Sequence, residues 1–205
     1  MPKTISRLYN SHAEARTVVR ELESAGINHG DLSILVSNVD SAYDEKTKSF
    51  PDRDLDGKDD RAEGARTGAG IGAAVGGTAG LLAGLGLMAI PGVGPVVAAG
   101  WLVATLTGAA AVGTAGGIVG ALSQAGVSPE DADVYAESIR RGGALVSVKV
   151  EEGDRARAQA LMDKSSVNAG NRAAMYRKDG WKRFDPAAPT YNADQVQKER
   201  ELYRL

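Results

Sequence analysis

The feature that most constrains this chain is a stretch of 63 residues, Thr67 to Pro129, that contains no Asp, Glu, Lys, Arg or His. It holds 17 of the 26 glycines. At 3.6 residues per turn, glycine at every fourth position would form a narrow furrow along one helix face. We therefore predict a glycine-zipper hairpin of two helices within residues 67–127, joined by the uncharged turn Pro91, Gly92, Gly94 and Pro95.

Two features favour a membrane location for this hairpin. The two predicted helices, residues 66–90 and 96–124, each exceed the roughly 20 residues that span about 30 Å of hydrocarbon. Arg61 and Arg66 precede the first helix and would hold that end on the cytoplasmic side. The sequence thus predicts transmembrane helices in the inner membrane, with a lipid bilayer as partner and both flanks in the cytoplasm.

The glycines also predict self-association. Glycine weakens helix propensity and partition into lipid, and its regular spacing is useful where another backbone packs closely. The residues expected to pack in this way are Gly68, Gly72, Gly76, Gly80 and Gly84 in the first helix, and Gly113, Gly116, Gly117 and Gly120 in the second. The alternative is a soluble cytoplasmic homo-oligomer, a structural assembly that buries the same hairpin between its copies.

The flanking segments predict an α+β domain. Residues 1–38 read as strand, helix and strand, with Ser11 as the helix cap. Residues 128–175 begin with Ser128-Pro129, a helix start, continue with a strand at 144–150, and add a helix and a short strand near Val167. This order predicts a ferredoxin-like, split β-α-β domain interrupted by the hairpin. Residues 176–205 are expected to form a strap that packs on the domain, followed by a short helix.

Residues 39–66 form an acidic segment with nine acids and six bases, which reads as a solvated loop. It contains a calcium-loop pattern, whose ligands would be Asp52, Asp54, Asp56, the carbonyl of Lys58, Asp60 and Glu63. No amphipathic helix precedes the pattern, and Asp59 stands where an apolar residue is usual. A Ca²⁺-responsive regulatory module is therefore a further alternative, and no other cofactor is predicted.

Composition excludes several functional classes. The formal net charge of −2 argues against nucleic acid as a partner, and the absence of cysteine removes thiol chemistry. The N-terminus lacks the apolar core of a secretory signal. His12 and His29 have no acidic or serine neighbour at a telling spacing, and the glycine repeats lack the strand and lysine of a nucleotide loop. We therefore do not expect the protein to be an enzyme.

Three stretches carry a resemblance to a known family: the glycine-rich run from Gly68, the segment GVSPEDADVYAESIRRGGALVSVKV, and the closing GWKRFDPAAPTY. Together they resemble the bacterial heat-induced general stress proteins and their proteobacterial relatives with a glycine-rich insert. The resemblance implies a stress-induced, non-enzymatic protein whose protein partner is unknown. The sequence therefore favours a stress-response protein that is membrane-associated and self-associating.

Overall fold

The computed structural model describes residues 2–39, 86–111 and 117–202. Its centre is a five-stranded sheet in the order β1-β5-β2-β4-β3, in which all neighbouring strands are antiparallel. The strands are β1 (Lys3–Tyr9), β2 (Leu32–Ser37), β3 (Gly86–Ile90), β4 (Gly94–Gly100) and β5 (Ala144–Val150). The predicted α+β class is confirmed.

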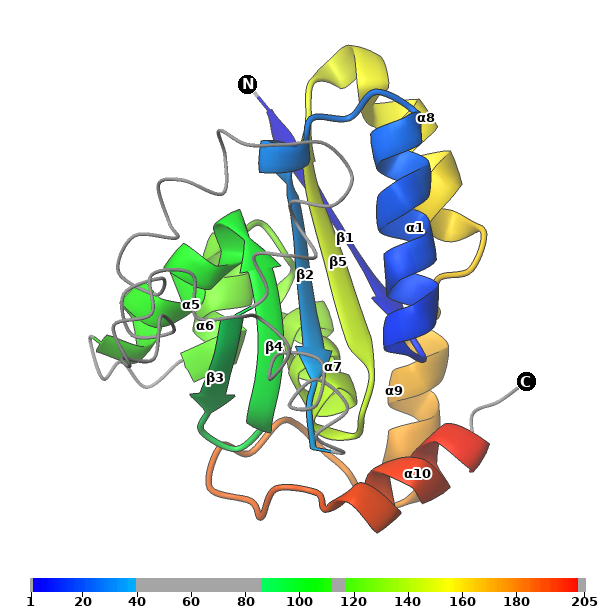
Figure 1. The fold of residues 1–205 in the computed structure, drawn as a ribbon. Coiled ribbons are helices and arrows are strands. Elements are labelled where there is room, and N and C mark those ends of the chain that lie inside the picture. Colours follow the sequence, from blue (N-terminus) through cyan, green and yellow to red (C-terminus); the bar gives the residue numbers. More distant parts are fainter. Residues whose placement is uncertain (1, 40–85, 112–116, 203–205) are drawn as a thin grey trace, which may run out of the picture.

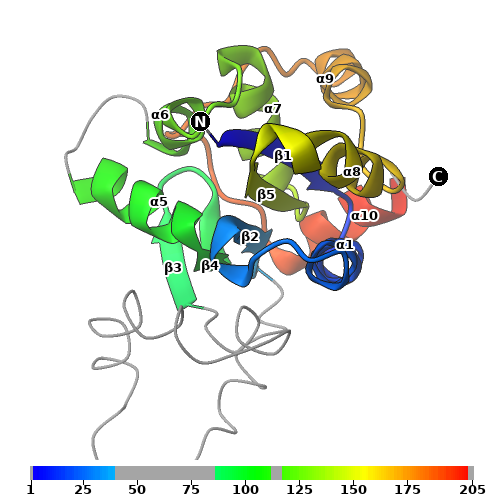
Figure 2. The ribbon, with the colours of Figure 1, turned by 90° about the horizontal axis from the view of Figure 1, so that it is seen from above.

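Seven α-helices lie within the described residues and cover both faces of the sheet (Figures 1 and 2). They are α1 (His12–Ser24), α5 (Trp101–Ala111), α6 (Gly117–Gln124), α7 (Pro129–Arg140), α8 (Glu152–Asp163), α9 (Ala169–Lys178) and α10 (Ala193–Leu202). Helices α1 and α8 share one hydrophobic core with one face of the sheet, and α5, α6 and α7 share a second core with the other face.

The flanking elements form where their local signals predict them. Ser11 caps α1 by accepting a hydrogen bond from the Glu14 backbone N–H, and Ser128 caps α7 in the same way from Asp131. Helix α1 connects β1 to β2, which lie on either side of β5. The expected strand near Val167 is reduced to a single antiparallel bridge with Leu8, because α9 begins two residues later.

The predicted helical hairpin is wrong at its centre, because residues 86–100 form a β-hairpin. The Val93 N–H donates to the Ile90 carbonyl at 3.0 Å, which closes a four-residue turn with Pro91 second and Gly92 third. Gly92 has φ +76°, the conformation that the third position of a type II turn requires. The strands form because β4 pairs with β2 along five positions, from Ser37↔Val96 to Ser33↔Gly100, and these pairs satisfy its backbone inside the sheet.

The transmembrane prediction is also wrong for the part of the chain that the structure describes. None of its helices is both long enough and apolar enough to span a bilayer. The first five residues of the predicted second helix, 96–100, are strand, and the helices described in the rest of it, α5 and α6, are 11 and 8 residues long. Such helices fall well short of the roughly 20 residues that a crossing needs.

Candidate functional site

The tip of the β3–β4 hairpin is held by a strap, residues 181–192, which runs from α9 to α10 across the turn (Figure 1). A Cβ placed on Gly92 would lie 2.5 Å from Cα of Pro186 and 2.8 Å from its carbonyl oxygen. A Cβ on Gly94 would lie 3.3 Å from the Thr190 methyl group. The two glycines therefore allow the strap to lie directly against the turn.

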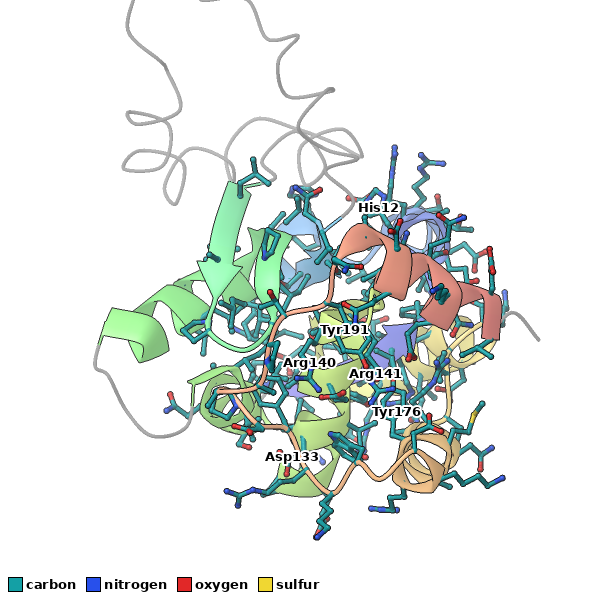
Figure 3. All side chains as sticks on the ribbon, turned by 90° about the horizontal axis from the view of Figure 1, so that it is seen from below. His12, Asp133, Arg140, Arg141, Tyr176 and Tyr191 are labelled. Carbon is teal, nitrogen blue, oxygen red and sulfur yellow. The ribbon has the colours of Figure 1, made fainter. Side chains whose placement is uncertain are left out.

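The end of the strap is anchored by stacked arginines. The guanidinium of Arg141 lies 4.1 Å from the ring centre of Tyr176 and 5.5 Å from that of Tyr191, which ends the strap. Arg140 lies 5.4 Å from the Tyr191 ring. Figure 3 shows these four side chains gathered where α7, α9 and α10 meet. Cation–π contacts of this kind are strongest when both groups are shielded from water.

A buried carboxylate organises these arginines. Glu137 is fully buried and accepts hydrogen bonds from Arg140 Nη2 at 2.7 Å and from Arg141 Nε at 2.6 Å. Arg141 also donates from Nη1 to Glu199 at 3.1 Å, which ties α7 to α10. Removing one partner from such a buried network leaves an uncompensated charge, so the cluster strongly favours this one arrangement of strap and helices.

Burial and charge shift the pKa of three groups in the cluster, Arg141, Tyr176 and Tyr191. Burial opposes the charge of Arg141, but the hydrogen bond and charge of Glu137 and the charge of Glu199 outweigh it, so the pKa of Arg141 is raised. Burial raises the pKa of Tyr176 to about 12 and also raises that of Tyr191. The adjacent cavity of about 20 Å³ has room for a single water molecule. The cluster, which we call the arginine clamp, therefore anchors the end of the strap at Tyr191, and the strap in turn lies against the hairpin turn.

The outer edge of β3 is the side of the strand that faces away from β4. The Asn38 N–H donates to the Pro95 carbonyl at 2.8 Å, so the backbone groups of Pro95 point toward β2. Because Ala89 lies opposite Pro95 and Leu87 opposite Val97, the N–H and C=O groups of Ala89 and Leu87 point away from β4. The outer edge of β3 thus carries two N–H donors and two C=O acceptors, one of each at Leu87 and at Ala89.

The side chains of this edge are apolar. Leu87 is 49% exposed, one of two large hydrophobic side chains exposed in the described residues, and Ala89 beside it is exposed too. Met88 and Ile90 alternate with them and pack against the second core. The strand contains no charge and no proline. Within the described residues, β3 pairs only with β4.

The opposite edge of the sheet, β1, is built differently. The Val167 N–H donates to the Leu8 carbonyl at 2.7 Å, and the Tyr135 hydroxyl donates to the Ser6 carbonyl at 3.2 Å. Lys3 and Arg7 add charges along the same strand. Charges and covered backbone groups are the usual protection of an edge strand against pairing with another chain. Among the described residues, β1 is protected in this way and β3 has no such protection.

The sequence-predicted residues fall into three groups. Of the predicted turn residues, Pro91 and Gly92 do lie in a turn, but it joins strands, and Gly94 and Pro95 already belong to β4. Gly117 and Gly120 lie in α6, where an added Cβ would meet no described atom within 4 Å, so their packing role stays a prediction. The other predicted packing glycines (Gly68, Gly72, Gly76, Gly80, Gly84, Gly113, Gly116) and the calcium residues (Asp52, Asp54, Asp56, Lys58, Asp60, Glu63) lie outside the described residues.

No protein-family model, curated protein or solved structure matches the chain. The resemblance to general stress proteins therefore stays a prediction. The described residues contain no group of three acidic or histidine side chains placed to hold a metal ion. The function is therefore inferred from the geometry of the two sheet edges, the hairpin and the arginine clamp.

Proposed function

We propose that the protein is a non-catalytic structural protein that assembles with its own copies through the outer edge of β3. The observation that carries this proposal is the run of outward backbone groups at Leu87 and Ala89 on an apolar, uncharged strand. A strand with these properties is a template for pairing with another strand. The predicted homo-oligomer is retained, with a sheet edge in place of a helix face.

A twofold axis at Met88 would satisfy the whole edge. Two antiparallel copies of β3 would then place Leu87 opposite Ala89 of the second copy, and Ala89 opposite its Leu87. Both pairs are hydrogen-bonded pairs, since their backbone groups face outward, and together they make four hydrogen bonds. The two copies of Met88 would face each other on the axis. Such an interface is self-complementary and closed, which is the common arrangement in homodimers.

The insertion of the hairpin explains why this edge exists. We infer a ferredoxin-like core from β1, α1, β2, β5, α8 and the Val167 bridge, since α1 and α8 lie on the same face. In that interpretation β2 would be an edge of the core, and β4 and β3 extend the sheet beyond it. The pairing of β4 with β2 joins the hairpin to this sheet, and the strap packs against its turn. The added edge is five residues long, so the dimer is expected to be weak and dependent on concentration.

Cysteine cross-linking tests the proposal, since the native chain has no cysteine. In the proposed register the two copies of residue 88 form a non-hydrogen-bonded pair, with Cα atoms about 4.5 Å apart. That distance lies within the range of disulfides, about 4.4–6.8 Å. Met88→Cys should therefore form a disulfide-linked dimer under mild oxidation. Leu87→Cys is the matched control, because its two copies would be about 7–8 Å apart, too far for a disulfide.

The second measurement is the monomer–dimer equilibrium, followed by sedimentation velocity for two variants without cysteine. Ala89→Pro removes one outward N–H and leaves the bonds to β4 intact, so it should abolish the concentration-dependent dimer. Ala89→Val keeps the N–H and should leave the dimer in place. A native chain that remains monomeric up to millimolar concentration would overturn the proposal. Efficient cross-linking of Leu87→Cys but not Met88→Cys would overturn the proposed register.

A further inference from the structure

A polar cleft of about 170 Å³ lies beside β1, between the start of α7 and the start of α8. It is separate from the cavity beside the arginine clamp, which has room for a single water molecule. Helices α7 and α8 lie on opposite faces of the sheet, so the cleft has two different walls with β1 between them (Figure 2). Its volume is sufficient for a molecule of the size of a small amino acid.

The α7 wall carries one negative charge, the carboxylate of Asp131. The Asp131 backbone N–H donates to the Ser128 cap, but its partly buried carboxylate makes no hydrogen bond or ion pair with a side chain among the described residues. Burial raises the pKa of Tyr135 to about 12 and the Asp131 charge adds to this rise, so the carboxylate lies near the Tyr135 hydroxyl. A carboxylate in this position can accept charge-assisted hydrogen bonds from an ammonium group.

The α8 wall carries a positive charge, the guanidinium of Arg155. Its ion pair with Glu152 is long, with Nη1 3.5 Å from the carboxylate, and the Glu152 side chain is 70% exposed. Exposed pairs of this kind contribute little to stability. Glu152 also lies 3.5 Å from the Lys3 ammonium group. Arg155 can therefore bind a second carboxylate while Lys3 continues to pair with Glu152.

The other polar groups of the cleft add no net charge. Arg7 donates from Nε to Asp163 at 2.5 Å and from Nη1 to the Ser6 carbonyl at 3.0 Å, so its charge is compensated. The side chains of Thr4 and Gln159 have no hydrogen-bond partner among the described residues. A cleft with one available charge of each sign on opposite walls fits a ligand that is dipolar and neutral overall.

We propose that this cleft binds a free amino acid in its zwitterionic form, with the ammonium group at Asp131 and the carboxylate at Arg155. A simple anion would be repelled by Asp131, and a simple cation by Arg155. Thr4 and Gln159 offer uncharged donors and acceptors, which suit a small polar side chain such as that of serine. The site uses no outward backbone group of β1 and lies at the edge opposite to β3, so it stands independently of the proposed self-assembly.

Titration of L-serine into the ¹⁵N-labelled full chain tests this proposal. Binding should be saturable, with a dissociation constant of about 1–10 mM, and should shift the resonances of the Asp131 amide and the Gln159 side-chain amide. Two analogues each remove one charge of the ligand: ethanolamine lacks the carboxylate, and N-acetyl-L-serine lacks the ammonium group. Each should bind about 10-fold more weakly than serine, because one charge-assisted contact is lost.

Matched variants of the protein give the complementary result. Asp131→Asn removes the charge on the α7 wall and keeps the backbone bond to Ser128, and it should weaken serine binding about 10-fold. Glu130→Gln removes a charge from the same helix turn outside the cleft and should bind like the native chain. Arg155→Gln and its control Arg157→Gln make the same comparison on α8. The amide spectrum of each variant also shows whether it is folded.

Three results would overturn the proposal. The first is a shift that grows linearly with serine concentration and does not saturate. The second is an analogue, ethanolamine or N-acetyl-L-serine, that binds as tightly as serine. The third is equal weakening by Asp131→Asn and Glu130→Gln, because overall charge rather than the cleft would then determine binding.

Discussion

The contact between the hairpin turn and the strap leads to a quantitative prediction for Gly92→Ala. Gly92 has φ +76°, and its Cβ would lie 2.5 Å from the Pro186 Cα and 2.8–2.9 Å from the Pro186 carbonyl group. Gly180 has nearly the same φ, +86°, but a Cβ there would meet no described atom within 4 Å. Comparing Gly92→Ala with Gly180→Ala therefore separates the cost of the backbone conformation, which both variants have, from the cost of the close contact, which only Gly92→Ala has.

The magnitudes follow from these two terms. A left-handed conformation costs an L-residue about 1–2 kcal/mol, so Gly180→Ala should lower the free energy of unfolding by that amount. Gly92→Ala carries the same cost plus overpacking against backbone atoms, which adds about 1–3 kcal/mol. Its total should therefore be about 2–5 kcal/mol. For a chain of this size, each kcal/mol corresponds to roughly 2–4 °C in Tm.

Urea unfolding monitored by tryptophan fluorescence measures both variants. Trp181 lies at the start of the strap, with its ring 5.8 Å from that of Tyr176, so its emission also reports whether the strap remains docked. Gly92→Ala should alter the native emission spectrum, whereas Gly180→Ala should shift only the unfolding midpoint. Equal destabilisation by the two variants, with an unchanged native spectrum in both, would refute the close contact between strap and turn.

Two further variants test other parts of the structure. Gly120→Ala should stabilise the protein by about 0.5–1 kcal/mol in urea unfolding, since the site is helical and open; destabilisation would instead indicate a partner packed on that glycine. Burial, followed by the Asp131 charge, raises the pKa of Tyr135 from 10.0 to about 12. Because the folded pKa is the higher one, this tyrosine contributes stability below pH 10 that is lost as pH rises from 10 to 12. Tyr135→Phe should therefore lose about 2 kcal/mol less than the native chain between pH 9 and 12, and an equal loss would contradict the shift.

The flanking elements were predictable because their signals are local. A serine cap followed by proline and acids defines the start of α7 within four residues of sequence, and α1 shows four apolar residues at helical spacing. Alternating valines identified β5 as a strand. In each case the information needed lies within one element, so tertiary contacts reinforce the local preference.

The hairpin was not predictable in the same way, because an uncharged apolar run shows no clear period. A buried strand and a buried helix look alike in such a run, and glycine spacing favoured the helix. The deciding interactions are distant: Val97 pairs with Val36, 61 positions away in the sequence. Two local cues did exist. Pro91-Gly92 fits a type II turn, and Val93, Val96 and Val97 are β-branched residues, which favour strands.

The arginine clamp has no local signature either. Arg141 and Glu199 are 58 positions apart, and Tyr191 reaches Arg141 only because the strap folds back across the hairpin. In the sequence, Arg140 and Arg141 read as ordinary charges at a helix end. Their burial and their contacts exist only once α7, α9 and α10 have come together.

The absence of charge that suggested a lipid environment has a second physical explanation at β3. A lysine at position 87 or 89 would keep a charged side chain beside the outward backbone groups, and pairing with another strand would then cost desolvation. Lys3 and Arg7 impose that cost on β1, where the Tyr135 hydroxyl also occupies the outward carbonyl of Ser6. An uncharged β3 removes the cost. The same composition therefore fits a strand that pairs with its own copy, and strand pairing requires neither a continuous helix nor a bilayer.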